Sequence, residues 1–301
     1  MKLSVVISAY NAQETILRCL ESVKDLADEI ILVDNSSTDS TNSIARKYTK
    51  KIYKRENNPM LNVNKNFGIS KATGDWVLYL DSDEECSPEL QKEIGLVLRD
   101  PKADGYFMPR KNIIFNKWIQ NSIWWPDYQM RLFRKGKGKY PEVHVHEKIE
   151  VTGETANLEN PLIHYNYNSI TQWIQKMDQI YTENEVQNLI RQNKKVTWVD
   201  AIRFPADDFL KTFFAQKGYK DGLHGLVLSI LQAFYSEVIF AKLWEKQGFE
   251  EENSDNFLDH VHLEFGKIGK ELTYWFSNEL IHKTKNPLQS IRLRLKRKSS
   301  S

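Results

Sequence analysis

The first hundred residues repeat one pattern, in which a short apolar run is followed by a segment with helical spacing of apolar residues. The runs are LSVVISAY from residue 3, EIILVD from residue 29, KIYK from residue 51 and WVLYL from residue 76. Near-continuous apolar runs are typical of parallel strands that are covered on both faces. Strand followed by helix, four times over, predicts an α/β fold with a mostly parallel, doubly wound sheet flanked by helices.

Local signals for helix starts accompany two of these runs. Asn11 stands three residues before Glu14, which is the spacing of a capping box. Ser87, Pro88 and Glu89 follow the fourth run and supply an N-cap, a proline at the first helical position and an early acid. We therefore expect helices to begin after the first and the fourth strand.

The strand and helix alternation ends near residue 105. The segments GYFMPRKNIIF and YQMRLFRK still have the composition of strands, but after His164 the chain becomes mainly helical and aromatic. We expect an α/β domain over residues 1–165 and a mainly helical C-terminal region over residues 166–301.

The most apolar later stretch, residues 225–244, is interrupted by polar and charged residues. It lacks the ~18 uninterrupted apolar residues that a membrane span would need, so we expect no transmembrane segment. The spacing predicts an amphipathic helix instead. Its predicted apolar stripe consists of Leu223, Leu226, Ile230, Phe234, Val238 and Ala241.

Charge and cysteine content narrow the function classes. Lys and Arg total 42 against 40 Asp and Glu, and a net charge of +2 does not indicate a nucleic-acid binder. Two cysteines, Cys19 and Cys86, cannot form a disulfide framework and suit a reducing compartment. The N-terminus has the pattern of a strand rather than of a secretory signal. We expect a cytoplasmic protein without a nucleic-acid partner.

An acidic segment, DSDEE, directly follows the fourth apolar run. On an extended segment, residues two apart project to the same side, so Asp81 and Asp83 could aim at one point. Mg²⁺ and Mn²⁺ take oxygen ligands and commonly bridge to substrate phosphates. The same acids would also suit the flank of a helix N-terminus, where the helix dipole favours negative charge. The pattern by itself leaves both interpretations open.

The order and spacing of three segments resemble the family 2 glycosyltransferases of the GT-A fold. The segments are VVISAYNAQETILRCLESV, EIILVDNSSTDST and NKNFGISKATGDWVLYLDSDE, and the resemblance covers roughly the first 165 residues. It implies a Rossmann-like GT-A domain, a nucleotide-sugar donor and a divalent metal, Mn²⁺ or Mg²⁺. It also implies transfer to an acceptor hydroxyl with inversion at the sugar carbon.

The resemblance assigns donor and metal roles to residues near the predicted strand ends. Asp34 accepts hydrogen bonds when ionised and could take the N3-H of uracil, which would favour a UDP sugar. Asp39 suits either the donor site or the N-cap of the next helix. The other donor-site candidates are Ala9, Tyr10, Asn11, Glu14, Lys65, Asn66, Asp81, Ser82 and Arg131. The metal candidates are Asp83, Asp81 and His164.

The candidate for the catalytic base is Glu147, within PEVHVHEKIEV. Similar inverting transferases of bacterial cell-surface glycan synthesis carry a His-Glu motif downstream of Arg-Leu-Phe, and a base must take the acceptor proton as the hydroxyl attacks. Glu84 and Asp127 are competing candidates. The order His-x-His-Glu differs from the zinc-protease motif, so we do not expect a zinc hydrolase from His144 and His146.

Trp124, Trp125 and Asp127 are the candidates for acceptor binding. Indole faces can stack on sugar rings, and a nearby carboxylate can hold hydroxyls. A pair of aromatic residues is more often part of a core, so the sequence leaves that alternative open.

The C-terminal tail is basic and amphipathic. Leu288, Ile291 and Leu295 share one helical face, and the segment IRLRLKRK carries five cations and no acid. Such a tail could bind an anionic membrane surface, on the inner face of a bacterial inner membrane, or could be a solvated terminus. Membrane contact would suit a lipid-linked acceptor.

A narrower resemblance, to bacterial lipopolysaccharide core β-1,4-glucosyltransferases, includes the segments VHEKIEVTG, LIHYNYNS and YKDGLHG. It implies UDP-glucose as donor and a lipid-linked core glycan as acceptor. The alternatives are a protein or other glycan acceptor, and a non-catalytic nucleotide-sugar-binding membrane scaffold. A nucleotidyltransferase would need a Gly-rich basic loop after the first strand, where this chain has SAYNAQET.

Overall fold

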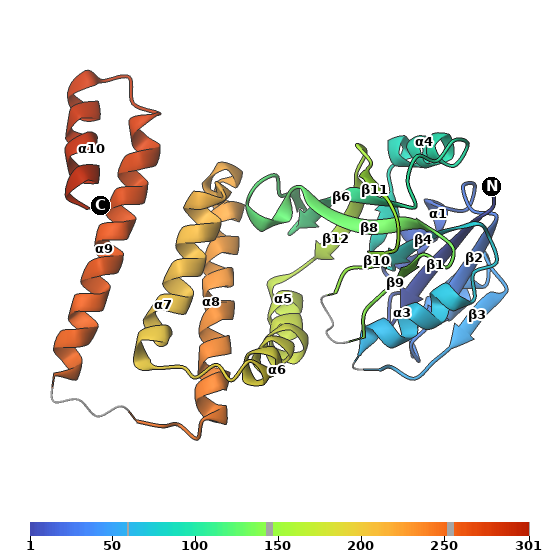
Figure 1. The fold of residues 1–301 in the computed structure, drawn as a ribbon, viewed down its shortest axis with the longest axis horizontal. Helices are drawn as coiled ribbons and strands as arrows, with labels where there is room; N and C mark the ends of the chain where they lie inside the picture. The colour runs from blue at the N-terminus through green and yellow to red at the C-terminus, as the bar shows by residue number, and fades with distance from the viewer. Residues whose placement is uncertain (59, 143–146, 252–255, 301) are drawn as a thin grey trace. The chain divides into compact units, whose positions relative to one another are not determined.

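The computed structural model describes residues 1–58, 60–142, 147–251 and 256–300. The chain divides into two compact units, which can be followed in Figure 1 by colour from the blue N-terminus to the red C-terminus. The first unit comprises Met1–Gln120 and Trp124–Ser169, and the second comprises Asn121–Ile123 and Ile170–Ser301. We predicted a boundary at residue 165, and the main division falls after Ser169.

The first unit is built on one large sheet. Its first four strands pair in the order β3-β2-β1-β4, and all three pairings are parallel. These strands are β1 (Leu3–Ala9), β2 (Glu29–Asp34), β3 (Lys51–Lys54) and β4 (Trp76–Asp81). The four apolar runs therefore form parallel strands, as the sequence predicts.

The sheet continues beyond β4 in the order β8-β6-β12-β5. These strands are β5 (Glu84–Cys86), β6 (Gly105–Ile114), β8 (Asp127–Arg134) and β12 (Leu162–Tyr167). β6 and β12 are parallel, whereas β4 with β8, β8 with β6, and β12 with β5 are antiparallel. The short strands are β7 (Lys117–Trp118), β9 (Gly138–Lys139), β10 (Glu150–Val151) and β11 (Thr155–Asn157). The predicted α/β fold is confirmed, with antiparallel pairs confined to the later strands.

Helices cover both faces of the sheet. Alternate residues of each strand point to opposite faces, so neighbouring residues of β1 pack against different helices. Val5 and Ile7 of β1 share a buried cluster with residues of α1, α2 and α4, whereas Val6 belongs to a second cluster, against which Ile69 of α3 packs. The helices are α1 (Ile16–Glu21), α2 (Thr41–Ala45), α3 (Leu61–Ser70) and α4 (Pro88–Val97). The unit is therefore doubly wound.

Gly68 allows α3 to approach the sheet closely. A Cβ atom at this position would lie 2.7 Å from Cγ2 of Val33 and 2.8 Å from Cγ1 of Val6. Any side chain would push the helix outward, since such distances are shorter than van der Waals contact. The close packing brings the first turns of α3, including Lys65, to the carboxyl ends of β1 and β4.

Helices follow the first and the fourth strand as predicted, but only one of the two predicted caps forms. Ser87 caps α4 by accepting a hydrogen bond from the Leu90 N–H, with Pro88 in the first turn. The predicted capping box of Asn11 and Glu14 does not form, because α1 begins at Ile16. Asn11 instead adopts a left-handed backbone conformation with φ of +46°.

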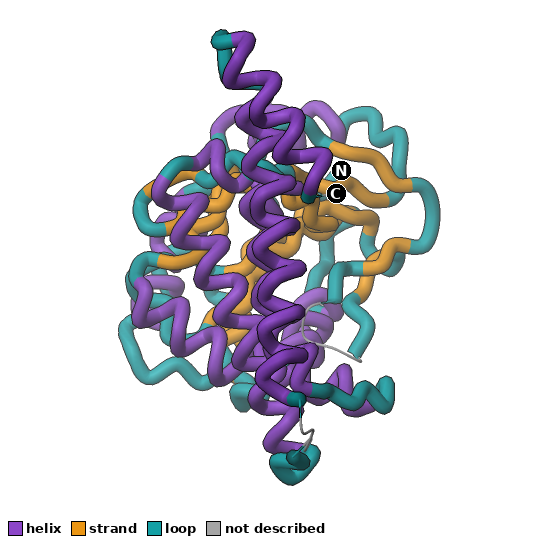
Figure 2. The backbone as a smooth tube through the Cα atoms, turned by 90° about the vertical axis from the view of Figure 1, so that its left-hand side faces the viewer, coloured by secondary structure: helices purple, strands orange, loops and turns teal. Residues whose placement is uncertain are grey.

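The second unit is helical, as predicted. Figure 2 shows its long helices, in purple, lying alongside one another. The α-helices of this unit are α5 (Ile170–Lys176), α6 (Glu183–Arg191), α7 (Trp198–Phe209), α8 (Leu223–Lys246), α9 (Phe257–Ile281) and α10 (Pro287–Ser299). Shorter helical turns connect some of them: η2 (Met177–Thr182), η3 (Leu210–Ala215) and η4 (Gly218–Asp221). The turn η1 (Ser122–Trp124) lies earlier, between β7 and β8.

The predicted helix α8 is present, but its apolar stripe is not its buried face. Leu223, Ile230 and Phe234 are exposed. The buried face holds small and polar residues beside aliphatic ones: Gly225, Leu228, Ser229, Ser236, Ile239 and Leu243. α8 packs against α7, where Asp208 accepts hydrogen bonds from Ser236 and Gln232, so polar contacts help to choose the buried face.

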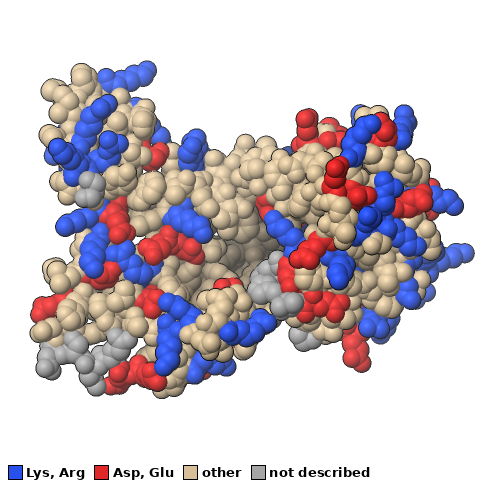
Figure 3. Space-filling view, viewed as in Figure 1, with Lys and Arg blue, Asp and Glu red and all other residues tan. Residues whose placement is uncertain are grey.

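By length and composition, α8 is the one helix among the described residues that could cross a membrane. Core helices of soluble proteins share these properties, so the expectation of no membrane span stays a prediction. Figure 3 shows Lys and Arg interspersed with Asp and Glu on the visible face of both units, in keeping with the near balance of charges.

Candidate active site

The candidate donor-site residues lie where the parallel strands end. Ala9 of β1 is in register with Asp34 of β2, and Ser8 of β1 is in register with Asp81 of β4. The carboxyl ends of these strands form one edge of the sheet, which is where open α/β sheets bind ligands. Topology thus brings together side chains that are far apart in the sequence.

Two loops beyond this edge are joined by polar contacts. The Asn11 N–H donates to Oγ of Ser37 over 2.9 Å, and Oδ1 of Asn11 accepts from the Thr38 N–H over 2.9 Å. Asp34 is fully buried and accepts from the Ser37 N–H at 3.0 Å and from Nδ2 of Asn42 at 2.7 Å. Its carboxylate therefore holds the loop after β2, and its role in recognising uracil stays a prediction.

The neighbouring candidates differ in their accessibility. Ala9 is buried, and its carbonyl accepts from the Asn35 N–H over 2.8 Å. Tyr10 is half exposed, and Glu14 is exposed in the turn before α1. Asp39 lies just before the N-cap of α2, Ser40, and accepts from the Thr41 N–H at 2.9 Å. Of these residues, Tyr10 offers the largest accessible apolar surface to a ligand.

Asp81 lies between two cations. Nζ of Lys65 is 3.1 Å from its Oδ1, Nη2 of Arg131 is 2.7 Å from its Oδ2, and the Tyr79 hydroxyl is 3.1 Å from Oδ1. Burial raises the pKa of the Asp81 carboxyl, but the charges of Lys65 and Arg131 outweigh burial and lower that pKa. Asp81 is therefore held as a carboxylate with cations on both of its oxygens.

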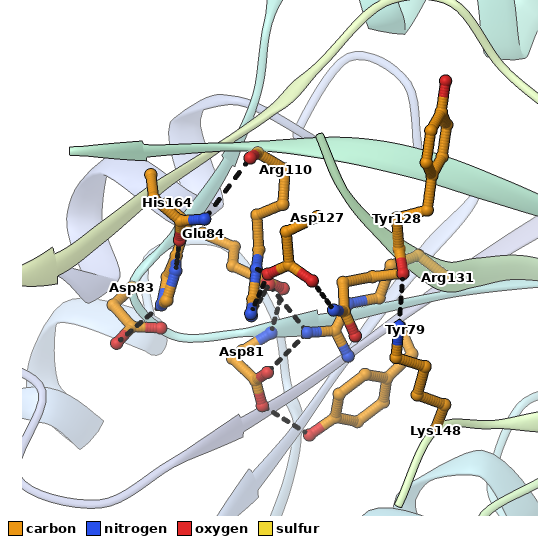
Figure 4. A network of polar contacts seen from close by, with 12 residues as sticks. Tyr79, Asp81, Asp83, Glu84, Arg110, Asp127, Tyr128, Arg131, Lys148 and His164 are labelled. Carbon is orange, nitrogen blue, oxygen red and sulfur yellow. Dashed lines mark hydrogen bonds and ion pairs between the residues drawn. The ribbon is translucent and has the colours of Figure 1, made fainter. Parts of the chain in front are cut away.

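Glu84 is the buried centre of this network, which Figure 4 shows from close by. Its Oε1 lies 2.7 Å from Nη2 of Arg131 and 3.5 Å from Nη1 of Arg110. Its Oε2 accepts from the Asp81 N–H over 2.9 Å. Burial lowers the pKa of Arg131, yet Glu84 and the neighbouring groups raise it well above its ordinary value. Glu84 thus neutralises the buried Arg131 and the half-buried Arg110 and holds both in place.

Asp83 faces His164 and does not converge with Asp81. Its Oδ2 lies 3.6 Å from Nε2 of His164. The prediction that Asp81 and Asp83 share one side of an extended segment is wrong, because Ser82 and Asp83 form a turn between β4 and β5. Within the described ranges, no three or more His, Cys, Asp or Glu side chains are grouped as a metal site would need. Of the three metal candidates, the structure brings Asp83 and His164 together, whereas Asp81 pairs with Lys65 and Arg131.

Glu147 lines a cavity of about 180 Å³ beside this network, together with Lys65, Asp81, Arg131 and Tyr140. Oε2 of Glu147 accepts from Nδ2 of Asn62 on α3 over 2.9 Å. The preceding residues, His144 and His146, lie outside the described residues.

Asn66 does not line this cavity with its neighbour Lys65. Its side chain pairs with the backbone of Tyr140, donating to the carbonyl at 2.8 Å and accepting from the N–H at 2.9 Å. Asn66 therefore positions the segment that carries Tyr140.

Comparison with known proteins identifies the family. The family model described as Glycosyl transferase family 2 matches residues 4–149. An uncharacterized glycosyltransferase of Rickettsia typhi is 30% identical over 276 residues, which cover 86% of this chain and 93% of that protein. The chain belongs to glycosyltransferase family 2.

Two further proteins are similar to this glycosyltransferase along most of its chain. LpsC of Rhizobium meliloti, a lipopolysaccharide core biosynthesis glycosyltransferase, is 25% identical over 283 residues, 86% of this chain and 98% of that protein. The solved structure of Staphylococcus aureus TarS 1–349 in complex with UDP-GlcNAc is similar with 18% identity and a TM-score of 0.43, covering 85% of this chain and 95% of that chain. The predicted family and enzyme class are confirmed.

The two tryptophans proposed for acceptor binding by the glycosyltransferase both have aromatic partners. The ring of Trp125 meets Trp118 edge to face with centroids 5.3 Å apart, and Trp124 meets Tyr167 with centroids 6.4 Å apart. Both indoles are half-buried, so each keeps some surface for a ligand. Their acceptor role stays a prediction.

Asp127, the third acceptor candidate, is paired with Arg110. Nε of Arg110 donates to its Oδ2 over 2.8 Å, and Nε2 of Gln129 donates to its Oδ1 over 2.6 Å. Burial raises the pKa of Asp127, but Arg110 outweighs burial and lowers it. A carboxylate held in this way is a weaker base than an unpaired one.

Sequence reasoning missed Arg110 and Asn112 of the glycosyltransferase, and it treated Glu84 only as a competing base. Arg110 and Asn112 are two residues apart on a strand, so alternation could have placed them on one face. No local signal shows that β6 pairs with β12, or that β12 pairs with β5, because these pairings join segments that are distant in the sequence.

Replacing the buried carboxylate in Glu84→Gln should lower the free energy of unfolding by about 3–5 kcal/mol. The amide cannot neutralise Arg131 and Arg110, which stay buried. Urea unfolding followed by circular dichroism measures the change. The neighbouring variant Glu85→Gln is the control, because Glu85 is partly exposed and should cost less than about 1 kcal/mol. Equal, small losses for both variants would contradict the central role of Glu84.

Proposed function

We propose that this family 2 enzyme is an inverting, metal-dependent glycosyltransferase that moves a hexose from a UDP-sugar to a hydroxyl of a bacterial cell-surface glycan. The observation that carries the proposal is the group of Lys65, Arg131, Asp83 and His164 at the carboxyl ends of β1 and β4. This group combines cations suited to a diphosphate with ligands suited to a divalent metal. The similarity to LpsC, a lipopolysaccharide core biosynthesis glycosyltransferase, supports a lipopolysaccharide core as the acceptor. We propose glucose as the hexose and UDP-glucose as the donor.

The donor would bind along the strand ends. The half-exposed ring of Tyr10 can stack on a base, beside the loops that Asn11 and Asp34 hold in place. Lys65 and Arg131, which now neutralise Asp81, lie where a diphosphate would add negative charge. Their charges stabilise the leaving group as the sugar departs.

Asp83 and His164 fit the residues that would hold Mn²⁺ or Mg²⁺. One carboxylate and one imidazole leave the remaining coordination to phosphate oxygens and water, which is common for these ions in nucleotide sites. When bound, the metal would neutralise charge on the departing diphosphate. Asp81 suits this role less well, because its two oxygens already contact Lys65 and Arg131.

Of the three candidate bases, Glu147 suits the role best. Glu84 is fully buried, with Oε1 held by two arginines and Oε2 by the Asp81 N–H. Asp127 is held as a carboxylate of lowered pKa by Arg110. Glu147 lines the cavity that also contains Lys65 and Asp81. Its carboxylate would take the proton of the acceptor hydroxyl as that oxygen attacks the sugar.

The donor and the metal should bind together, because the two protein ligands do not complete a coordination shell. Titration calorimetry should show that the wild type binds Mn²⁺ and UDP jointly. The variant Asp83→Asn should lose this joint binding, and it should also lose turnover of every sugar in a panel of radiolabelled UDP sugars. The control is Asp100→Asn, because Asp100 is an exposed carboxylate that pairs with Lys102. Full activity in EDTA would refute the proposed dependence on a divalent metal. Binding without turnover would instead support a non-catalytic scaffold.

Glu147→Gln should slow transfer by about 10²-fold or more, the scale of general-base catalysis, while donor affinity stays close to that of the wild type. Initial rates with saturating donor separate the two effects. Glu150→Gln, an exposed carboxylate on β10, should leave the rate unchanged. A Glu147→Gln variant with full turnover would move the base to another residue.

The tail geometry supports binding to an anionic membrane, and we propose a peripheral location on the cytoplasmic leaflet. α10 packs on α9 with one face, where Arg297 donates to Oδ1 of Asn278 over 3.0 Å. Leu288, Ile291 and Leu295 are 78%, 55% and 64% exposed. Helical spacing places Arg292, Arg294, Lys296 and Lys298 around that apolar stripe, an arrangement typical of helices that lie on anionic lipid surfaces.

Replacing Leu288, Ile291 and Leu295 together by Ser should strongly reduce sedimentation with anionic phospholipid vesicles, because the apolar stripe can no longer enter the interface. The double variant Leu17→Ser and Leu96→Ser removes exposed apolar side chains of the first unit and should not change it. Unchanged binding of the triple variant would rule out α10 as the anchor.

A further inference from the structure

Asn112 lies beside His164 on adjacent strands. β6 and β12 pair in parallel with Asn112 and His164 in register, and on the other side of β12 His164 is in register with Glu84. Oδ1 of Asn112 lies 2.7 Å from Nδ1 of His164. Both side chains are buried, at 0% and 7% exposure. A short hydrogen bond therefore links the imidazole to a neighbouring amide away from solvent.

The orientation of the Asn112 amide follows from its other contacts. Its Nδ2 lies 2.8 Å from the Trp124 carbonyl oxygen and 3.4 Å from the Arg110 carbonyl oxygen. The flipped amide would place an oxygen against two carbonyl oxygens, with no hydrogen between them. Nδ2 thus donates to the backbone, and Oδ1 is left to face His164.

The amide in turn decides which ring nitrogen of His164 carries a hydrogen. Since Oδ1 of Asn112 can only accept, Nδ1 of His164 must donate to it. Nε2 then points toward Asp83, whose Oδ2 is 3.6 Å away. The nitrogen that faces the carboxylate is the one that can offer a lone pair to a metal.

We propose that Asn112 is a positioning residue that fixes the Nδ1–H tautomer of His164, so that Nε2 and Asp83 can together bind a divalent cation. This inference rests on the proposed metal-dependent function. Metal-binding histidines commonly donate their second ring N–H to such a partner, and loss of the partner typically weakens metal affinity by about 10–100-fold. Asn112 would act only through His164 and would not touch the donor.

The first test is a nitrogen-15 NMR spectrum of the histidine rings of the wild type at pH 8.5, with His164 assigned by comparison with His164→Gln. A signal pattern of protonated Nδ1 and unprotonated Nε2 is expected. Histidine rings without such a partner favour the opposite tautomer, so a protonated Nε2 alone would overturn the proposal. This measurement needs no variant of Asn112 to fold.

The second test measures Mn²⁺ affinity in the presence of UDP by electron paramagnetic resonance. Asn112→Leu should weaken it by about 10–100-fold and return His164 to the Nε2–H tautomer. Asn112→Asp keeps an acceptor for Nδ1 and should retain more of the affinity than Asn112→Leu, although its second oxygen would face the carbonyls of Trp124 and Arg110. Asn160→Leu is the control, because Asn160 is an asparagine whose amide donates to Glu93 rather than to a residue of the site.

The outcomes separate this inference from the proposed function. Joint binding of Mn²⁺ and UDP by the wild type, with unchanged affinity in Asn112→Leu, overturns the role of Asn112 alone. Absence of joint binding in the wild type overturns the metal-dependent function and this inference with it. Loss of affinity in Asn112→Leu together with the changed tautomer supports both.

Discussion

Neutralisation of buried charge at one edge of the sheet is the constraint on which the first unit depends. Glu84 and Arg131 are almost completely buried, and an unpaired charge in such a place costs several kcal/mol. β4, β5, β6 and β8 must therefore meet in the register that pairs these groups. Since Asp81 and Arg110 belong to the same network, the strand register that pairs the buried charges also sets the geometry of the site.

The same network separates the two acids of the Asp-x-Asp motif. Asp81 forms ion pairs with Lys65 and Arg131, whereas the turn at residues 82–83 directs Asp83 toward His164. Asp81 thus pairs with cations, whereas Asp83 faces an imidazole. The proposed function assigns the cations to a diphosphate and the second pair to a metal.

Much of the fold could be predicted, because strand and helix patterns are local. The four parallel strands and the Ser87 cap were predicted from neighbouring residues, and the GT-A family from short segments. The prediction of a capping box at Asn11 was wrong, because the Asn11 side chain accepts a hydrogen bond from the Thr38 N–H of a loop distant in the sequence. The buried face of α8 was wrong because apolar spacing identifies a helix but does not show which partner it meets.

The sequence by itself determined the order of strands and helices, the family and the residue types near the strand ends, since these depend on contacts between neighbours along the chain. Only the tertiary structure decided that Glu84 would join two arginines and that Asn112 would orient His164, 52 residues away. Strand pairing over such separations depends on the packing and charge of the whole sheet, which no local segment encodes.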